Sequence, residues 1–314
     1  MNSSSHPLAI GIDFGGTSIK SALIQESCIL ARGRTLNPQT GGGAENTLRE
    51  IETVVRELCS GLPAAVPVGI GLPGLVDSVN GIVHQLSNVP GWREIPVARI
   101  LRERLGVPVI LENDANAMAY AEWRYGAARN TLHALCITLG TGVGGALILD
   151  GKLYRGAQLS AGEVGHTSID YRGLPGPYGN FGCLESYVGN NAISTRALAA
   201  YAAAHLPPPS PECSPRDLST AAEKGCPVAQ SLWEKIGTEL GAAFANAVWL
   251  LNPDAIVIGG GVANAGAFVF DPLQHSLRSR TSRVIHENLR VVGAALGNDA
   301  GAIGCAALAL DAVG

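Results

Sequence analysis

The chain has 314 residues, of which 46% are hydrophobic and 15% charged, enough for one large domain or two ordinary ones. Lys and Arg number 22 against 26 Asp and Glu, so the formal net charge is −4, and no basic run occurs. This charge argues against nucleic acid as the main partner, because phosphate-backbone binding needs clustered Lys and Arg. No apolar run is long enough for a membrane span.

The N-terminal residues and the cysteines indicate a compartment. The segment MNSSSHP lacks the basic and apolar regions of a secretory signal. Seven cysteines are an odd number, and they are scattered without a C-x-x-C pair. We therefore expect a cytoplasmic protein with reduced cysteines and no disulfides.

Strands and helices alternate through the first part of the chain. The segment 45–59 carries apolar residues at helical spacing, and short apolar runs ending in Gly or Pro-Gly are typical of buried strands. The pattern predicts strands at 8–16, 18–25, 28–35, 67–74 and 108–114, and helices at 45–59, 97–106 and 115–126.

A similar unit then returns. Residues 133–156 read as strand, glycine turn, strand, Asp-Gly turn and strand, and ITLGTGVGGALIL (137–149) resembles IDFGGTSIKSALI (12–24). Two copies of one unit indicate an internal duplication. The remaining patterns predict helices at 191–205, 228–251 and 299–312, a loop at 205–215 and a strand at 252–262. We expect an α/β protein with a cleft between two lobes.

Three glycine-rich turns follow apolar strands, at 13–17, 139–145 and 259–261. Glycine lets backbone N–H groups approach an anion and tolerates positive φ. One such turn is usually structural, but three of them, two in a duplicated unit, favour nucleotide binding. The turns match neither a Walker A loop nor a Rossmann fingerprint, because the glycines lie between strands.

These motifs together resemble the ROK family of bacterial repressors, open reading frames and sugar kinases. The resemblance extends from about residue 10 to 305. Its motifs are, in chain order, DFGGT (13–17), LPGLVD (72–77), ENDANA (112–117), LGTGVGG (139–145), GEVGH (162–166), GCLES (182–186) and NPDAIVIGGG (252–261).

The resemblance implies a two-lobed, actin-like ATPase (ribonuclease H-like) fold with duplicated βββαβα units. We expect a small lobe formed by 1–113 plus 299–314 and a large lobe formed by 114–298. ATP and Mg²⁺ are the implied cofactors, with Asp13 orienting a hydrated Mg²⁺. The implied nucleotide contacts are Asp13, Gly15, Gly16, Thr17, Lys20, Gly140, Thr141, Gly142, Gly260 and Gly261. Homodimers are common in the family, so we expect one here.

Asp114 is the expected general base. It lies where a predicted buried strand ends and a helix begins, which is also where an Asp or Asn often serves only as a helix N-cap. Against the capping role, ligands of α/β sheets bind at the carboxyl ends of strands. The family resemblance, in which this aspartate takes the proton from the sugar hydroxyl, decides for catalysis.

The sugar contacts also follow from the resemblance. Carboxylates read sugars well because they accept charge-assisted hydrogen bonds from neighbouring hydroxyls. An isolated histidine is more often structural, and His166 is singled out because it lies in GEVGH. The expected substrate contacts are Gly74, Ser87, Asn113, Asp114, Glu163, His166 and Glu185.

The family's structural zinc site is incomplete in this sequence. Many members carry His and three Cys in this loop, a tetrahedral set. Here Gly176 and Tyr178 stand where two of the cysteines would be, leaving His166 and Cys183. We expect no zinc, and we expect proline rigidity and packing of Tyr178 to shape the loop.

Several functions stay open at this point. The leading one is an ATP-dependent kinase acting on the 6-hydroxyl of glucose, with N-acetylglucosamine, N-acetylmannosamine, mannose or fructose as alternative substrates and polyphosphate as an alternative donor. A ROK repressor that binds sugar without transferring phosphate is disfavoured, since only MNSSSHP precedes the first strand where repressors carry a helix-turn-helix. A sugar-binding protein with inactive phosphate loops is the third reading, and an ATP-turnover assay distinguishes it.

Overall fold

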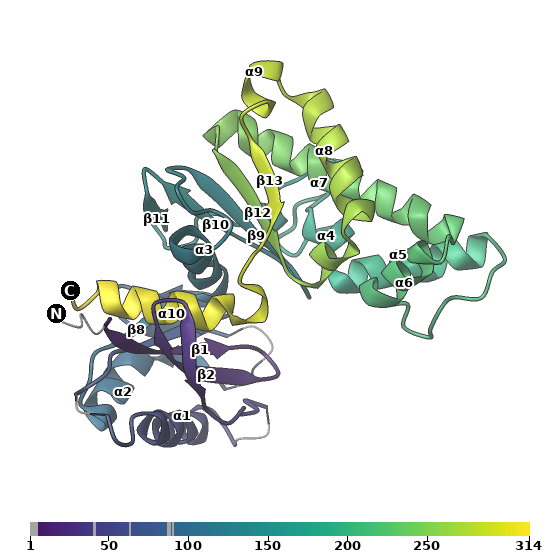
Figure 1. Ribbon diagram of the computed structural model, residues 1–314. Coiled ribbons are helices and arrows are strands. Elements are labelled where there is room, and N and C mark those ends of the chain that lie inside the picture. The colour runs from purple at the N-terminus through teal and green to yellow at the C-terminus, as the bar shows by residue number, and fades with distance from the viewer. Residues whose placement is uncertain (1–5, 40–41, 63, 87–88, 90) are drawn as a thin grey trace. The chain divides into compact units, whose positions relative to one another are not determined.

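The computed structural model describes residues 6–39, 42–62, 64–86, 89 and 91–314, which form two units (Figure 1). Unit 1 comprises residues 1–129, 153–161 and 295–314, and unit 2 comprises 130–152 and 162–294. Our expected boundary lay after residue 113. The contacts instead keep the following helix in unit 1, because it packs against the last helix of the chain and against a strand of the unit 1 sheet.

Unit 1 is built on a five-stranded sheet in the order β3-β2-β1-β4-β8. Its strands are β1 (Leu8–Phe14), β2 (Ile19–Gln25), β3 (Cys28–Arg32), β4 (Val68–Leu72) and β8 (Val109–Asn113). The first three form an antiparallel meander, and β4 and β8 add in parallel. A small sheet of β5 (Leu75–Asp77), β6 (Ile82–Gln85) and β7 (Arg93–Ile95) was not predicted, since its strands are very short.

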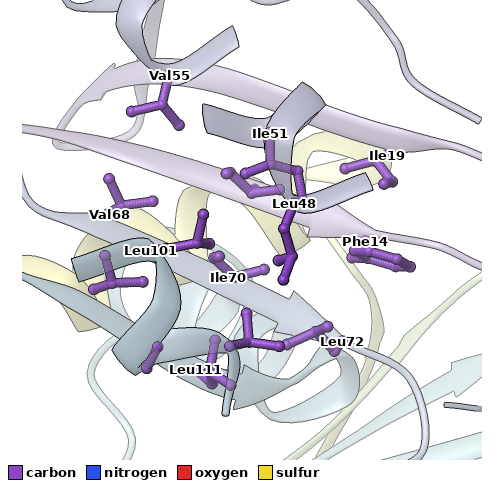
Figure 2. Packing of buried hydrophobic residues seen from close by; sticks show 14 of the residues in the cluster. Phe14, Ile19, Leu48, Ile51, Val55, Val68, Ile70, Leu72, Leu101 and Leu111 are labelled. Atoms are coloured by element: carbon purple, nitrogen blue, oxygen red, sulfur yellow. The ribbon is translucent and has the colours of Figure 1, made fainter. Parts of the chain in front are cut away.

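Helices cover both faces of this sheet (Figure 1). They are α1 (Ala44–Leu58), α2 (Val97–Leu105), α3 (Asp114–Tyr125) and, after the short turn η3 (Gly297–Asp299), α10 (Ala300–Asp311). A cluster of buried hydrophobic residues lies between the sheet and helices α1 and α2, and it includes Phe14, Leu48, Ile70 and Leu101 (Figure 2). Burying such side chains is the main favourable term in folding.

Helix α10 lies unusually close to the sheet and to α3. A Cβ at Gly11 of β1 would collide with the carbonyl oxygen of Ala302, and one at Gly69 of β4 with that of Cys305. Gly304 makes the same close approach to α3. Small residues on both partners therefore bring Cys305 against Gly69 and Gly71 of β4.

Unit 2 repeats the strand order of unit 1 as β11-β10-β9-β12-β13. These strands are β9 (Ala134–Leu139), β10 (Val143–Leu149), β11 (Lys152–Tyr154), β12 (Ala255–Gly259) and β13 (Arg290–Gly293). As in unit 1, β9 and β10 are antiparallel, and β12 and β13 continue in parallel. The equal order and directions confirm the predicted duplication.

The helices of unit 2 lie in the chain between β11 and β12 and between β12 and β13. They are η1 (Val164–His166), α4 (Glu185–Val188), α5 (Asn190–Ala203), α6 (Pro215–Glu223), α7 (Pro227–Leu251), η2 (Gly261–Ala265), α8 (Ala267–Arg280) and α9 (Arg283–His286). Helices α7 and α8 approach closely, since Gly237 and Gly241 leave no space for a Cβ. Among the described residues no helix is both long and apolar enough to cross a membrane.

Candidate functional site

In unit 1, the chemistry-bearing residues lie at the carboxyl ends of β1 and β8. Asp13 is the second-last residue of β1, is partly buried, and faces Lys20 across the β1–β2 ladder. Burial raises the pKa of Asp13, while the Lys20 ammonium lowers it. The charges of Asp13, Glu112 and Asp114, together with complete burial, raise the pKa of the Cys305 thiol well above its usual range. The carboxylates are therefore gathered around one point beneath the strand ends.

Asp114 is the first residue of α3, and the segment carrying it is held on both sides. The side-chain oxygen of Asn113 accepts hydrogen bonds from the N–H groups of Ala115 (2.9 Å) and Asn116 (3.2 Å), so Asn113 and not Asp114 is the N-cap. Asp114 Oδ1 accepts the N–H of Ala115 at 2.8 Å. Helix capping was the alternative role that the sequence allowed for Asp114, and in the structure Asn113 has that role.

Glu112 is a buried carboxylate that the sequence did not single out. Its residue is 2% exposed. Oε1 accepts hydrogen bonds from the backbone of Asn113 and the amide of Asn116, and Oε2 accepts two from Arg155. Its position gave a usable signal: Glu112 directly continues the apolar run 108–111, and a charged residue buried in a strand needs a partner. Nothing in the sequence pointed to Arg155.

Two further predicted contacts belong to unit 1. Gly74 lies between β4 and β5 with a φ of 94°, a conformation that favours glycine. Ser87 falls outside the described residues. Gly15 closes the β1–β2 turn by donating to the carbonyl oxygen of Ser18, and Thr17 is exposed beside it.

In unit 2, the glycine turns are open where a phosphate would approach. A Cβ at Gly140 or Gly261 would meet no atom within 4 Å. Gly260 is different, since its φ is 89° and a Cβ there would collide with the carbonyl oxygen of Leu139. Open backbone at Gly140 and Gly261, next to a glycine with positive φ, fits a turn that binds an anion such as a phosphate of ATP. For Mg²⁺, a carboxylate such as Asp13 together with phosphate oxygens and water is a suitable ligand set.

Glu163, His166 and Glu185 come together in unit 2. His166 Nε2 lies 4.0 Å from Glu163 Oε2. Burial raises the pKa of Glu163, His166 lowers it, and the charge of Glu185 raises it further. The three side chains expected to hold a sugar are therefore near neighbours, although up to 22 positions separate them in the sequence.

Glu185 also contacts the glycine turn of the same unit. Its Oε2 accepts the N–H of Val143 at 2.9 Å, and a Cβ at Gly142 would collide with this oxygen. The next helix is tied to the turn as well, because Asn190 donates its N–H to the carbonyl oxygen of Gly140. Glu185, an expected sugar contact, is thus connected directly to the glycine turn 139–145, which the sequence did not reveal.

The loop between His166 and Glu185 does not fit zinc. Within the described part of the chain, no three His, Cys, Asp or Glu residues are grouped to hold a metal. A Cβ at Gly176 would lie 2.5 Å from Cys183 Sγ, so the backbone here leaves no space for a ligand side chain. Asn180 also occupies this region and donates to the carbonyl oxygen of His166 at 3.2 Å.

Hydrogen bonds and one aromatic contact shape this loop. Ile169 donates to the carbonyl oxygen of Gly182, Leu174 donates to the Tyr187 hydroxyl, and Ser168 donates to the carbonyl oxygen of Phe181. The ring of Tyr178 stands edge-on to His166, with the ring centroids 5.1 Å apart. The packing expected of Tyr178 is present. Main-chain hydrogen bonds, such as those from Gly182 to Leu174 and from Leu184 to Thr167, also connect the loop.

Comparisons with known proteins agree with these features. Residues 9–312 match the model of the ROK family. The chain is 32% identical to the glucokinase of Thermotoga maritima over 311 residues, covering 97% of this chain and 98% of the relative. It is also 26% identical to the xylose repressor of Bacillus subtilis over 306 residues, covering 96% of this chain and 77% of that protein.

Solved structures give the same fold. A ROK glucokinase from Streptomyces griseus, in complex with glucose and AMPPNP, superposes with a TM-score of 0.80 at 33% identity, covering 97% of this chain and 99% of that one. This likeness confirms the expected actin-like, mixed α/β architecture and, with the full-length similarity to glucokinases, supports a sugar kinase. The chain belongs to the ROK family.

Proposed function

We propose that this protein transfers the γ-phosphoryl group of ATP to the 6-hydroxyl of glucose, with Asp114 as the general base. The observation that carries the proposal is that the expected general base and the expected sugar contacts each lie in a suitable arrangement within their own unit. Unit 1 presents Asp114 on a fixed helix start, and unit 2 brings Glu163, His166 and Glu185 together. The similarity to glucokinases supports glucose as the acceptor.

Each residue has a specific task in this proposal. Asp114 accepts the proton of the attacking hydroxyl, and Asn113 holds its backbone in place. Glu163, His166 and Glu185 bind other hydroxyls of the sugar and so orient the one that reacts. MgATP, when bound, supplies the phosphoryl group, and the open turns at Gly140 and Gly261 would hold its phosphates.

Other members of the same chemical class stay as alternatives. N-acetylglucosamine, N-acetylmannosamine, mannose or fructose could replace glucose as the acceptor, and polyphosphate could replace ATP. A sugar-binding regulator is the remote alternative, since a xylose repressor is also similar. A cytoplasmic location and a homodimer remain predictions.

The test is ADP release from MgATP against a panel of hexoses and N-acetylhexosamines, with Asp114→Asn as the control. We expect the highest kcat/KM with glucose. Turnover that is higher with another sugar would reject glucose but keep the kinase. No turnover with any sugar would reject the kinase, and calorimetric sugar binding without turnover would then favour the regulator.

A further inference from the structure

The segment 153–161 leaves the second unit and is fastened to the first. Its first two residues end β11 of the unit 2 sheet, and both its ends continue into unit 2, yet by its contacts the segment as a whole groups with unit 1. Leu153 packs against the cluster around Tyr120 and Cys305. Arg155 reaches the carboxylate of Glu112, with Nε–Oε2 and Nη2–Oε2 distances of 2.7 and 2.6 Å. Arg155 is therefore the polar attachment of this segment.

Arg155 holds its own segment by a second bond. Its carbonyl oxygen accepts the N–H of Ala161 at 2.9 Å, which closes the loop 155–161 at its base. Glu163 follows two residues after Ala161 in the sequence. The loop that Arg155 closes thus ends two residues before a residue that we propose to bind the sugar.

The other end of the ion pair lies beside the proposed base. Glu112 Oε1 accepts the N–H of Asn113 at 3.0 Å and the amide of Asn116 at 2.9 Å. Asp114 lies between these two residues. Both oxygens of Glu112 are occupied, so Glu112 is not available as a base itself.

We propose that Arg155 is a positioning residue that holds Asp114 through Glu112 and, by closing its own loop, also sets the chain leading to Glu163. Burying a carboxylate as deeply as that of Glu112 is costly unless it is paired and hydrogen-bonded. Without Arg155, the unpaired Glu112 side chain turns toward water, and the N–H of Asn113 and the amide of Asn116 lose their acceptor. The start of α3 then shifts, and Asp114 with it.

The effect on catalysis follows from the geometry. A displacement of about 1 Å of a reacting group can cost about 100-fold in rate. We expect Arg155→Gln to lower kcat about 100-fold and to raise the sugar KM, with the KM for ATP changed by less than about twofold, because its effect falls on the base and on the sugar segment. This expectation rests on the proposed kinase function.

Two companion variants separate positioning from general stability. Arg155→Lys restores the charge but not the paired N–H groups, so it should recover part of kcat. Glu112→Gln together with Arg155→Gln removes the unpaired buried charge, so the double variant should be less impaired than Arg155→Gln alone. Arg104→Gln is the matched control: Arg104 binds both oxygens of Glu45 at 2.8 Å in the same unit, on a helix away from Asp114. Its kinetics should equal those of the wild type.

Hydrogen exchange gives a readout that does not need turnover. In Arg155→Gln, the amides of residues 111–117 and 155–163 should exchange faster, while those of β12 should not change. Unchanged exchange at 111–117, or kinetics equal to those of Arg104→Gln, would overturn the proposal. Faster exchange at these amides in Arg155→Gln, together with a wild type that phosphorylates no sugar, would support the positioning contact and reject only the kinase function.

Discussion

The two glycine hairpins have the same place in their sheets but different surroundings. In the β1–β2 hairpin, Asp13 and Lys20 are opposite each other, so the first hairpin carries its own charges. At the corresponding place in the β9–β10 hairpin, Thr138 is opposite Gly144, and this turn is contacted by the carboxylate of Glu185 on α4. One hairpin thus carries its own charged side chains, and the other is contacted by a carboxylate from α4.

This difference suggests a division of tasks between the units. Unit 1 gathers carboxylates under the strand ends, where Asp114 begins α3. Unit 2 presents bare glycine turns and three side chains suited to a sugar. Variants in the unit 1 acid should therefore change kcat, whereas variants in unit 2 should change KM values.

The largest effect is expected for Asp114→Asn. General-base catalysis contributes about 10² to 10⁴ in rate, so kcat should fall by that factor. Asn keeps the oxygen that accepts the N–H of Ala115, so the thermal midpoint should stay close to that of the wild type. Steady-state kinetics and thermal unfolding measure the two quantities. A variant that retains more than about a tenth of the activity would assign the base elsewhere.

Glu185→Gln should couple the two substrates. The charge-assisted hydrogen bond from Val143 weakens, and the sugar loses an acceptor, so both the sugar KM and the ATP KM should rise, each by about tenfold or more. The measurement is a two-substrate kinetic matrix. A rise in the sugar KM alone would show that the contact with the glycine turn has no role in nucleotide binding.

Glu163→Gln should change the sugar KM and its pH dependence. Because the pKa of Glu163 is raised, the wild type loses this carboxylate acceptor as pH falls through a value above the ordinary glutamate range, and its sugar KM should rise there. At neutral pH the variant should show a sugar KM higher by about tenfold. That limb of its pH profile should be absent, while the kcat of Asp114-dependent transfer remains measurable.

The raised pKa of Glu163 also predicts how the Glu163→Gln substitution changes the stability of the fold. A folded-state pKa above the unfolded value means that this group contributes stability at low pH, which is lost as pH rises through the folded pKa. Glu163→Gln should therefore be as stable as the wild type or slightly more stable at pH 7. The gain is small, since the side chain is 45% exposed. A marked loss of thermal stability would contradict the expected environment of Glu163.

Gly140→Ala and Gly15→Ala compare the hairpins directly. The methyl group at Gly140 meets open space, so folding should be unaffected, and the KM for ATP should rise by about tenfold if phosphate approaches there. The methyl group at Gly15 would lie 3.0 Å from the carbonyl oxygen of Ser18, so this variant should also lose thermal stability. Equal stability of the two variants would show that the turns are equally open.

Much of the fold could be predicted because local patterns determine it. The duplicated hairpins, the helices α1, α2, α3 and α7 and the strand β8 follow from periodicity and from glycine turns. The sheet β5-β6-β7 and helix α8 were missed. The strands are too short for a pattern, and Pro272 lies inside α8, where proline usually indicates a break.

The site was predictable only where a motif carried it. Asp114 and GEVGH lie in recognisable motifs, but Arg155 meets Glu112 across 43 positions, and the bond from Val143 to Glu185 spans 42. Such pairs form only when the tertiary fold brings distant segments together, and no local sequence pattern indicates which residues will meet. Likewise, the sequence showed that two of the expected zinc ligands were missing, but not that the backbone at Gly176 lies too close to Cys183 for a ligand side chain.

The smallest effect is expected for Tyr178→Ala, which tests what shapes the sugar loop. The ring of Tyr178 is 77% exposed and contacts His166 only through its edge, while main-chain hydrogen bonds connect the loop without it. An aromatic pair contributes about 0.5–1.5 kcal/mol, so the sugar KM should rise by about threefold to tenfold and the ATP KM should not change. Tyr171→Ala, at an equally exposed tyrosine of the same loop with no recorded contact to His166, is the control and should behave as the wild type. If Tyr178→Ala leaves the sugar KM unchanged, the main-chain bonds alone orient His166, and the loss of two cysteines from this loop was compensated by its backbone.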